Sequence, residues 1–450
     1  MNTPSETKPA PVPATAKQAG KVAALKAVAA PEVWTERMLT ALVTGLKGNQ
    51  WFSLIDKVYR LDTLVAAWEK VRSNAGGSGV DGITVERFEK TCLDGLLVLK
   101  KQIQEAVYQP KPVKRVWIPK PGSTEKRPLG IPVVRDRIAQ TALRRVIEPI
   151  FEVEFAEHSY GFRPGRGCKD ALRRVQHLLD EGHTWIVDAD LKSYFDTIPK
   201  ERLMARVAER IADGRVLALI RSYLDQGVME GLRYYQAGED GTPQGAVVSP
   251  LLANIYLNPL DHLMADSGCE MVRYADDFII LCRSREAAEG ALARVQTWVA
   301  ENGLTLHPEK TRIVDATQKG GFDFLGYHFE RGYRWPRKKS RMKLEQSIRE
   351  LTPRRTCGCS LEQCIASLNE VLQGWYGYFK HSHWTAFEDV DQYVRGRLRS
   401  ILRNREKRRG RGRGQDHQKW RNHYFAKLGL FSLMQAHAET LVSLHHGATH

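Results

Sequence analysis

Two adjacent acidic residues stand between two apolar runs in Met271–Leu281, and this stretch most constrains how the chain can fold. Side chains alternate between the two faces of a strand, so neighbouring aspartates on one straight strand would point in opposite directions. A tight hairpin turn at Ala275–Asp277 would instead present Asp276 and Asp277 on one side. Paired carboxylates on a rigid sheet suit Mg²⁺, which prefers oxygen ligands. A solvated turn in an ordinary hairpin is the alternative for an isolated pair.

Two further segments favour the catalytic interpretation. The apolar run Trp185–Val187 leads into Asp190, as a buried strand does when it emerges at a site. Gly241–Leu257 has the pattern of a loop bounded by Gly and Pro, carrying Gln244, that enters an apolar helix. Asp190, the Gln244 loop and Asp276–Asp277 occur in the order found in template-directed polymerases. The sequence here resembles reverse transcriptases, in particular the bacterial group II intron-encoded reverse transcriptase/maturases.

The resemblance covers roughly residues 34–440 and implies an α+β, right-hand polymerase fold of fingers, palm and thumb, followed by a helical, basic maturase region. The N-terminal residues are rich in Ala, Pro, Lys and Thr, so we expect them to be disordered. The predicted domains are a disordered tail (1–33), an N-terminal extension with fingers (34–165), the palm (166–330), a helical thumb/maturase or X region (331–395) and a basic nucleic-acid-binding segment (396–450).

The resemblance also implies a reaction. A primer 3′-hydroxyl attacks the α-phosphorus of a dNTP, and two Mg²⁺ ions about 3.5–4 Å apart hold the attacking and leaving oxygens. Asp190, Asp276 and Asp277 are the predicted catalytic and metal-binding residues, with Asp190 and Asp276 bridging both ions and Asp277 in support.

Further residues are predicted around the nucleotide and the primer. A basic hairpin near residues 113–132 is either an exposed edge or the fingers hairpin whose cations hold the triphosphate. An aromatic residue after Asp190 is expected under the sugar, with the choice between two neighbours left open. The predicted dNTP-binding residues are Lys120, Arg127, Tyr194 or Phe195, Gln244 and Lys310, and the predicted primer grip is Phe324, Leu325 and Gly326.

Positive charge is concentrated towards the C-terminus. The formal net charge is +16, and residues 331–430 carry 24 Lys/Arg against 9 Asp/Glu. Such a lopsided block favours a polyanionic partner over a merely solvated surface. The apolar stripe from Leu361 to Phe379 is expected to be thumb core, so the arginines are the expected phosphate contacts. The candidates in this block are Arg395, Arg397, Arg399, Arg403, Arg405, Arg408 and Arg409. Arg163 and Arg166 are further candidates, because the aromatic and basic loop 159–167 matches the template-side segment of the family that the sequence resembles.

Cysteine use and hydropathy indicate the compartment. Seven cysteines without a secretory context favour reduced thiols, and Cys357, Cys359 and Cys364 lack the spacing of a zinc site. No apolar run is long enough to span a membrane, and the N-terminus has no compact apolar signal core. We therefore expect a cytoplasmic, nucleoid-associated ribonucleoprotein.

The expected partners follow from the family: group II intron RNA, an RNA template with its DNA primer, target DNA and dNTPs. Two other functions stay open at this point. One is a reverse transcriptase of the same family recruited to defence or spacer acquisition. The other is a splicing factor whose polymerase core is unused.

Overall fold

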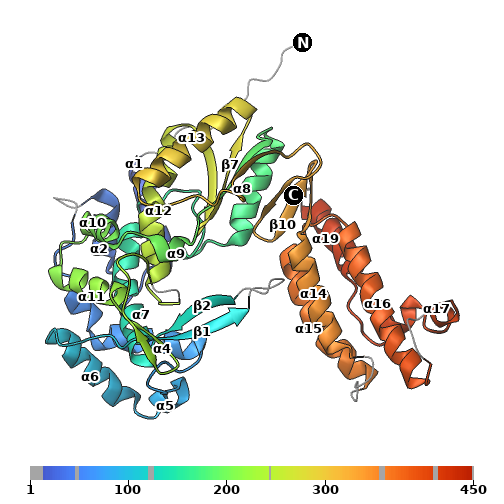
Figure 1. Cartoon of the computed structure of the whole chain (residues 1–450), viewed down its shortest axis with the longest axis horizontal. Helices are drawn as coiled ribbons and strands as arrows, with labels where there is room; N and C mark the ends of the chain where they lie inside the picture. The colour runs from blue at the N-terminus through green and yellow to red at the C-terminus, as the bar shows by residue number, and fades with distance from the viewer. Residues whose placement is uncertain are drawn as a thin grey trace. The chain divides into compact units, whose positions relative to one another are not determined.

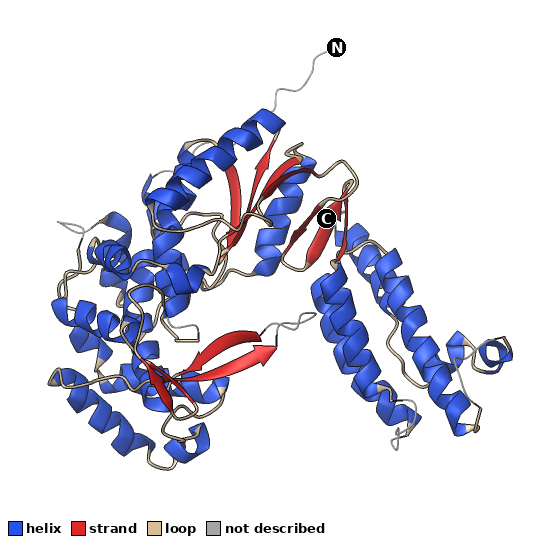
Figure 2. Cartoon of the chain, viewed as in Figure 1, coloured by secondary structure: helices blue, strands red, loops and turns tan. Residues whose placement is uncertain are grey.

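The chain forms two compact units, each built from helices and strands (Figures 1 and 2). The computed structural model describes residues 14–45, 50–119, 126–242, 245–353, 360–408 and 414–447. The first unit comprises Met1–Ile118 and Lys126–Ile313, and the second comprises Pro119–Glu125 and Val314–His450. The mixture of helices and sheets confirms the predicted α+β class. No helix in the described ranges is long and apolar enough to cross a membrane.

Helices dominate the start of the first unit. Residues 14–33 are not disordered as predicted, because α1 is helical and Leu25, Val33 and Trp34 are buried in the main core. The Trp34 indole also donates a 3.2 Å hydrogen bond to the Arg145 carbonyl. Apolar residues at helical spacing in this region pack against the main core, a contact that composition alone does not reveal. The helices are α1 (Ala14–Val28), α2 (Glu36–Thr44), α3 (Ile55–Val58), α4 (Leu61–Asn74), α5 (Val85–Glu89), α6 (Cys92–Gln104) and α7 (Val134–Glu152).

A four-stranded sheet follows, in the order β2-β1-β4-β5. It joins the hairpin predicted near residues 113–132, which is confirmed, to a second short pair of strands over residues 228–235. Strand β4 is parallel to β1, with Val113 opposite Val228, and antiparallel to β5, with Val228 opposite Tyr235. The strands are β1 (Val113–Pro119), β2 (Lys126–Ile131), β4 (Val228–Glu230) and β5 (Arg233–Tyr235).

The second sheet of this unit, in the order β6-β7-β3-β8, carries the acidic residues. Strands β3 and β7 are antiparallel and form its centre, and their apolar residues, such as Val187 and Ile280, are buried. Helix α8 packs against β6 and β7, α12 against β6, and α13 against β3 and β7. These elements are β3 (Trp185–Asp190), β6 (Glu270–Tyr274), β7 (Asp277–Cys282), β8 (Arg312–Asp315), α8 (Cys168–Asp180), α12 (Ser249–Asp266) and α13 (Arg285–Glu301).

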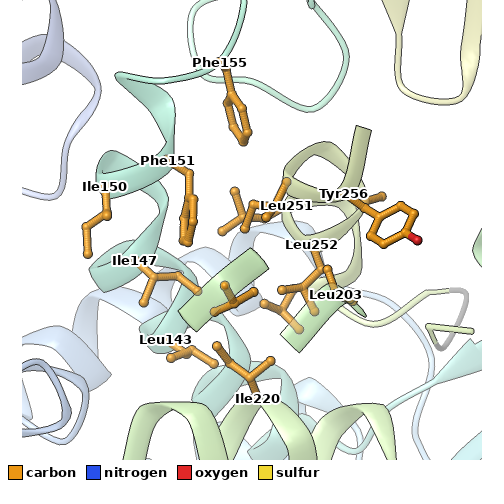
Figure 3. Packing of buried hydrophobic residues seen from close by; sticks show 14 of the residues in the cluster. Leu143, Ile147, Ile150, Phe151, Phe155, Leu203, Ile220, Leu251, Leu252 and Tyr256 are labelled. Atoms are coloured by element: carbon orange, nitrogen blue, oxygen red, sulfur yellow. The ribbon is translucent and has the colours of Figure 1, made fainter. Parts of the chain in front are cut away.

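The core of the first unit lies where α7 and α12 meet two shorter helices, α10 (Lys200–Ala208) and α11 (Gly214–Leu224). Figure 3 shows apolar side chains of these helices, together with Phe155 just beyond α7, gathered in one cluster. Burial of this apolar surface is the main favourable term that fixes the sheet on its helices. The labelled residues are Leu143, Ile147, Ile150, Phe151, Phe155, Leu203, Ile220, Leu251, Leu252 and Tyr256.

The second unit begins with a three-stranded antiparallel sheet, in the order β11-β10-β9, and continues as helices. The apolar stripe predicted over 361–379 is core: Leu368 and Leu372 are fully buried on α15, in one cluster with Phe387 and Leu398 of α16. The elements are β9 (Phe322–Phe324), β10 (Tyr327–Glu330), β11 (Tyr333–Pro336), α14 (Lys338–Leu351), α15 (Leu361–Phe379), α16 (Thr385–Arg405), α17 (Gln415–Lys419), α18 (Asn422–Lys427) and α19 (Leu433–Gly447).

Candidate active site

The three predicted aspartates meet at one end of the β6-β7-β3-β8 sheet. Asp190 is the last residue of β3, and its cross-strand partner is Asp277, the first residue of β7. Asp277 also pairs with Tyr274 of β6, so Ala275 and Asp276 form a two-residue turn. Directly opposed residues project from the same face of a sheet. The arrangement therefore brings the carboxylates of two strands and the turn between them to one place.

The turn has a backbone that sterics normally disfavour. Ala275 has φ 62°, in the left-handed region, and Asp276 is not among the residues with positive φ. A positive φ at the first turn residue alone is the pattern of a type II′ hairpin, where glycine is usual. Because an alanine is strained there, surrounding contacts have to hold the turn.

Arg273 supplies one of those contacts, and the sequence analysis missed it. Its side chain is 0% exposed and pairs with Asp261 through bonds of 2.7 and 2.5 Å. The same guanidinium donates to Asn254 Oδ1 at 2.9 Å and to the Ala275 carbonyl at 2.8 Å. Burial alone would lower the pKa of Arg273, but the charge of Asp261 and the bonds to it raise that pKa. Arg273 therefore stays charged, and its hydrogen bond to the Ala275 carbonyl holds the turn in place.

A second contact comes from the loop that precedes α8. The Tyr160 amide donates to the Arg273 carbonyl at 2.9 Å, so this loop runs along β6. Asn254 donates to the Gly161 carbonyl at 2.7 Å. A Cβ atom on Gly161 would lie 2.2 Å from the Ala275 nitrogen. Only glycine fits here, and its close approach supports the turn from the side.

Negative charge accumulates at the turn. The pKa of Asp276 is raised, first by burial and then by the charge of Asp190. Its own backbone amide and the charges of Arg127 and Arg273 act in the opposite direction. The charges of Asp190 and Arg127 therefore act on the Asp276 carboxyl in opposite directions.

A cation already occupies part of this site. Lys310 Nζ lies 2.6 Å from Asp190 Oδ2, and the two side chains are 60% and 38% exposed. An ion pair this exposed contributes only about 0–1 kcal/mol, so another cation can displace it. The donor set is carboxylate oxygen, which suits a hard divalent ion. As the side chains stand, no three His, Cys, Asp or Glu residues of the described segments are arranged to hold a metal ion. Lys310 therefore occupies Asp190 Oδ2, one of the two oxygens of this carboxylate.

Two family models match the chain. Residues 118–329 match the reverse transcriptase (RNA-dependent DNA polymerase) model, and residues 341–422 match the maturase-specific domain of group II introns. Protein YkfC of Escherichia coli K12 is 35% identical over 292 residues, covering 56% of this chain and 76% of that protein. The chain belongs to the group II intron reverse transcriptase/maturase family. This confirms the resemblance predicted from the sequence, and the polymerase domain is that of an RNA-directed DNA polymerase, a class that generally uses divalent metal ions.

Other relatives match smaller parts. The group II intron-encoded protein LtrA of Lactococcus lactis subsp. cremoris is 36% identical over 204 residues, covering 45% of this chain but 33% of LtrA. Among solved structures, a chain of a Cas6-RT-Cas1–Cas2 complex has a TM-score of 0.36 at 25% identity, covering 57% of this chain and 28% of that one. A telomerase from Candida albicans has a TM-score of 0.41 at 14% identity, covering 66% of this chain and 62% of that one.

The two candidate sugar contacts of this reverse transcriptase domain differ in burial. Tyr194 is only 2% exposed, and its hydroxyl donates to the Ala253 carbonyl at 2.6 Å. Tyr194 is therefore a core residue and not a nucleotide contact. Phe195 is partly exposed and packs edge-on against Tyr194, with ring centroids 5.5 Å apart. Of the other predicted nucleotide contacts, Arg127 is exposed on β2, while Lys120 and Gln244 lie outside the described residues.

The predicted primer grip is the turn between β9 and β10 in the second unit. Phe324 is buried beneath it, and Leu325 and Gly326 form the turn with φ of 45° and 85°. Tyr378 donates to the Leu325 carbonyl at 2.7 Å, and Ser340 donates to the Gly326 carbonyl at 3.2 Å. The turn is thus fixed from α14 and α15, although Phe324 itself belongs to the core.

Three of the arginines predicted to bind nucleic acid bond to acceptors within the protein. Arg163 is buried, pairs with Glu152 at 2.7 Å and donates to two carbonyls of its own loop. Arg399 is buried and donates to the Trp420 carbonyl at 2.9 Å. Arg397 donates to Thr352 Oγ1 at 2.9 Å. Charge pattern alone does not reveal that Arg163 and Arg399 are buried, while Arg397 is partly buried.

The remaining arginines differ in exposure. Arg405 is exposed at the end of α16, and Arg166 is half-buried with its guanidinium over the Tyr160 ring. Three others lie beside acids: Arg395 is 3.6 Å from Asp391, and Arg403 and Arg408 both pair with Asp416. Arg409 lies outside the described residues, as do Cys357 and Cys359, whereas Cys364 is buried on α15.

Proposed function

We propose that this chain is the RNA-directed DNA polymerase of a group II intron and also its maturase. It binds the intron RNA to assist splicing and copies that RNA into DNA during retromobility. The observation that carries the proposal is the pairing of Asp190 with Asp277 across neighbouring strands, with Asp276 in the turn that joins the second of these strands to β6.

In this proposal Asp190, Asp276 and Asp277 hold two Mg²⁺ ions. When bound, these ions supply positive charge to the attacking and leaving oxygens of the transferred phosphoryl group. Arg127 binds triphosphate oxygens with its planar fork of donors. Lys310 leaves Asp190 and neutralises phosphate charge instead. Fixed positions and fixed charges of this kind provide most of the catalysis in phosphoryl transfer.

The rest of the nucleotide site is assigned on the same basis. Phe195 supports the sugar of the incoming dNTP from its position directly after the buried Tyr194. Lys120 in the hairpin loop and Gln244 in the loop before α12 are proposed as further contacts to the nucleotide, and the turn at Leu325–Gly326 as the primer grip. We assign β1 and β2 to the fingers, the β6-β7-β3-β8 sheet to the palm, and α14 to α19 to the thumb and maturase regions.

The maturase role is proposed for the basic helical part of the chain. Base-paired RNA is recognised mainly through phosphates, 2′-hydroxyls and shape. The excess of 24 basic over 9 acidic residues between 331 and 430 suits such a partner. Arg405, exposed at the end of α16, is the proposed phosphate contact. The partners in this account are intron RNA, template with primer, target DNA and dNTPs, in a nucleoid-associated ribonucleoprotein of the cytoplasm.

Two assays on one protein preparation test the proposal. The purified protein is given an RNA template, an annealed DNA primer, dNTPs and Mg²⁺ at low salt, since charge-driven binding weakens steeply with salt. We expect DNA synthesis that requires the primer and extends it along the template. We also expect the same preparation to accelerate splicing of its intron RNA. Folded protein that makes no DNA contradicts the polymerase half of the proposal. DNA synthesis without any effect on splicing contradicts the maturase half.

A further inference from the structure

A fully buried glutamine on α7 bonds to the backbone of the loop that leads into α12. Gln140 is 0% exposed, and its Oε1 accepts hydrogen bonds from the Val247 amide at 2.8 Å and from the Val248 amide at 3.4 Å. These residues lie 107 and 108 positions further along the chain. A buried polar side chain needs such partners, because an unmade hydrogen bond in the interior is costly. Gln140 takes no part in the sites described above.

Gln140 replaces the local bond that usually fixes the entry to a helix. An N-cap is most often Ser, Thr, Asp or Asn, whose side-chain oxygen bonds to the first turn. The N-cap of α12 is Val248, and it makes no side-chain bond of this kind. Gln140 instead holds the backbone of Val247 and Val248 from α7, and the two helices continue into one apolar cluster that includes Leu143 and Leu251 (Figure 3). The start of α12 is therefore fixed from α7.

The same loop lies against the strand that carries Arg127. Gly245 has φ 101°, and a Cβ atom there would lie 2.3 Å from the Gly130 carbonyl oxygen and 2.9 Å from Leu129 Cδ1. Only glycine allows the loop to come this close to β2. Arg127, the proposed triphosphate contact, precedes Leu129 and Gly130 on this strand. A displacement of Gly245 toward β2 would therefore clash with the strand that holds Arg127.

The beginning of the loop is bonded to the segment that carries Phe195. The Thr242 amide donates a 2.7 Å hydrogen bond to the Phe195 carbonyl. Phe195 is the proposed support of the dNTP sugar. One loop thus touches the elements that carry two proposed nucleotide contacts, Phe195 and Arg127, and Gln140 holds the end of this loop that enters α12. A change in the position of the loop should therefore reach both nucleotide contacts.

We propose that Gln140 is a positioning residue for the nucleotide site. By fixing residues 245–248, it keeps Arg127 and Phe195 at the spacing that one dNTP requires. Gln140 touches no substrate itself, because its side chain is fully buried. The inference rests on the proposed function, since it takes a dNTP as the ligand of Arg127 and Phe195. Loss of the Gln140 acceptor should weaken dNTP binding more than it slows the chemical step.

Steady-state primer extension at varied dNTP concentration tests the positioning role. Gln140 Nε2 has no hydrogen-bond partner among the described residues, so Gln140→Met, of similar volume, removes the two loop bonds and no other in that part of the chain. Gln140→Asn keeps the amide but draws its oxygen back by one carbon. Both variants should raise the KM for dNTP by about three- to tenfold, as expected for one or two lost hydrogen bonds, with kcat within about twofold of the parent value.

Two further variants separate the acceptor from a general loss of structure. Gln140→Glu keeps an oxygen acceptor at the same reach and should bring the KM for dNTP back toward the parent value. Thr141→Val is the matched control on α7, since Thr141 is also buried and its hydroxyl donates to the Arg137 carbonyl of the same helix at 2.7 Å. It removes a hydrogen bond inside α7 rather than one to the loop, so the KM for dNTP should stay within about twofold of the parent value.

Hydrogen exchange read by mass spectrometry follows the bond without polymerisation. The peptide that contains Val247 and Val248 should exchange at least about fivefold faster in Gln140→Met than in the parent, and slowly again in Gln140→Glu.

The two readings together decide the inference. Unchanged exchange or an unchanged KM for dNTP in folded Gln140→Met would overturn it, as would a KM raised equally in Gln140→Glu. If Gln140→Met does not fold, Gln140→Asn decides by the same two readings. A parent that shows the expected exchange but extends no primer contradicts the proposed function, and with it the positioning role, while the bond from Gln140 to the loop is supported.

Discussion

The guanidinium of Arg273 donates a 2.8 Å hydrogen bond to the carbonyl of Ala275, two residues along the same chain. This bond reaches from the penultimate residue of β6 into the hairpin turn that carries Asp276. Asp261, whose carboxylate lies 2.5 Å from the Arg273 guanidinium, stabilises the buried positive charge of Arg273. The position of the candidate catalytic carboxylates is therefore coupled to a fully buried ion pair.

Removing Arg273 should disorder the hairpin turn and lower the free energy of unfolding of the protein. Arg273→Ala leaves Asp261 buried without its partner, a change that typically costs about 3–5 kcal/mol of unfolding free energy. Urea unfolding followed by circular dichroism measures this cost. Arg283→Ala, which removes an exposed arginine just beyond β7, is the control and should cost far less. A similar small loss for both variants would show that the clamp does not hold the turn.

Lys310 should compete with Mg²⁺ for Asp190. Lys310→Ala removes the ammonium 2.6 Å from Asp190, so the Mg²⁺ concentration for half-maximal primer extension should fall by about two- to fivefold, as expected for an exposed pair. The KM for dNTP should rise in the same variant if Lys310 moves to the triphosphate. Lys169→Ala, an exposed lysine on α8, should change neither value. An unchanged Mg²⁺ requirement in Lys310→Ala would contradict the competition.

Asp136 should make stability depend on pH. This buried carboxyl accepts bonds from Tyr108 at 2.7 Å and from the Lys111 amide at 2.8 Å, but burial is the largest effect and raises its pKa above 3.8. In the window between its ordinary and its raised pKa, the folded state holds more protons than the unfolded state, so stability falls as pH rises. The unfolding free energy of the parent relative to Asp136→Asn should therefore decrease from acidic to neutral pH. A difference that is constant or that grows with pH would contradict the assignment.

Two arginines of α16 should respond differently to alanine. Arg405 is exposed, so Arg405→Ala should weaken RNA binding and reduce the dependence of log affinity on log salt by roughly 0.7–0.9 for each lost phosphate contact. Arg399 is buried against Trp420, so Arg399→Ala should lower the unfolding free energy and leave the salt dependence as it is. The reverse pattern would restore the role predicted for Arg399 from sequence.

The acidic hairpin could be predicted because its signals are local. Two acids between β-favouring runs define a turn, and the register that opposes Asp190 to Asp277 follows once the apolar residues of both strands are buried. The sequence could not show which of Tyr194 and Phe195 lies under the sugar, since both are aromatic. Which of them is buried depends on the contact with Ala253, a residue distant in sequence.

The sequence did not reveal which charged side chains are buried. Arg163 and Arg399 lie in arginine-rich segments that suggest phosphate binding, yet each meets internal acceptors that only the fold brings close. A usable signal existed for Arg273, which interrupts an apolar run next to the acidic pair, and for Asn254, which interrupts the apolar run of α12. A polar residue inside such a run requires a buried partner, and here the two partners are bonded to each other.

The most direct test of the central claim is primer extension by an Asp276→Ala, Asp277→Ala double variant. Parent, double variant and Asp266→Ala, which removes an exposed aspartate at the end of α12, are compared on one RNA template with Mg²⁺. The account predicts full-length DNA from the parent and from Asp266→Ala, and none from the double variant, with template binding and circular dichroism retained in all three. DNA synthesis by the folded double variant would contradict the assignment of the turn as the catalytic site.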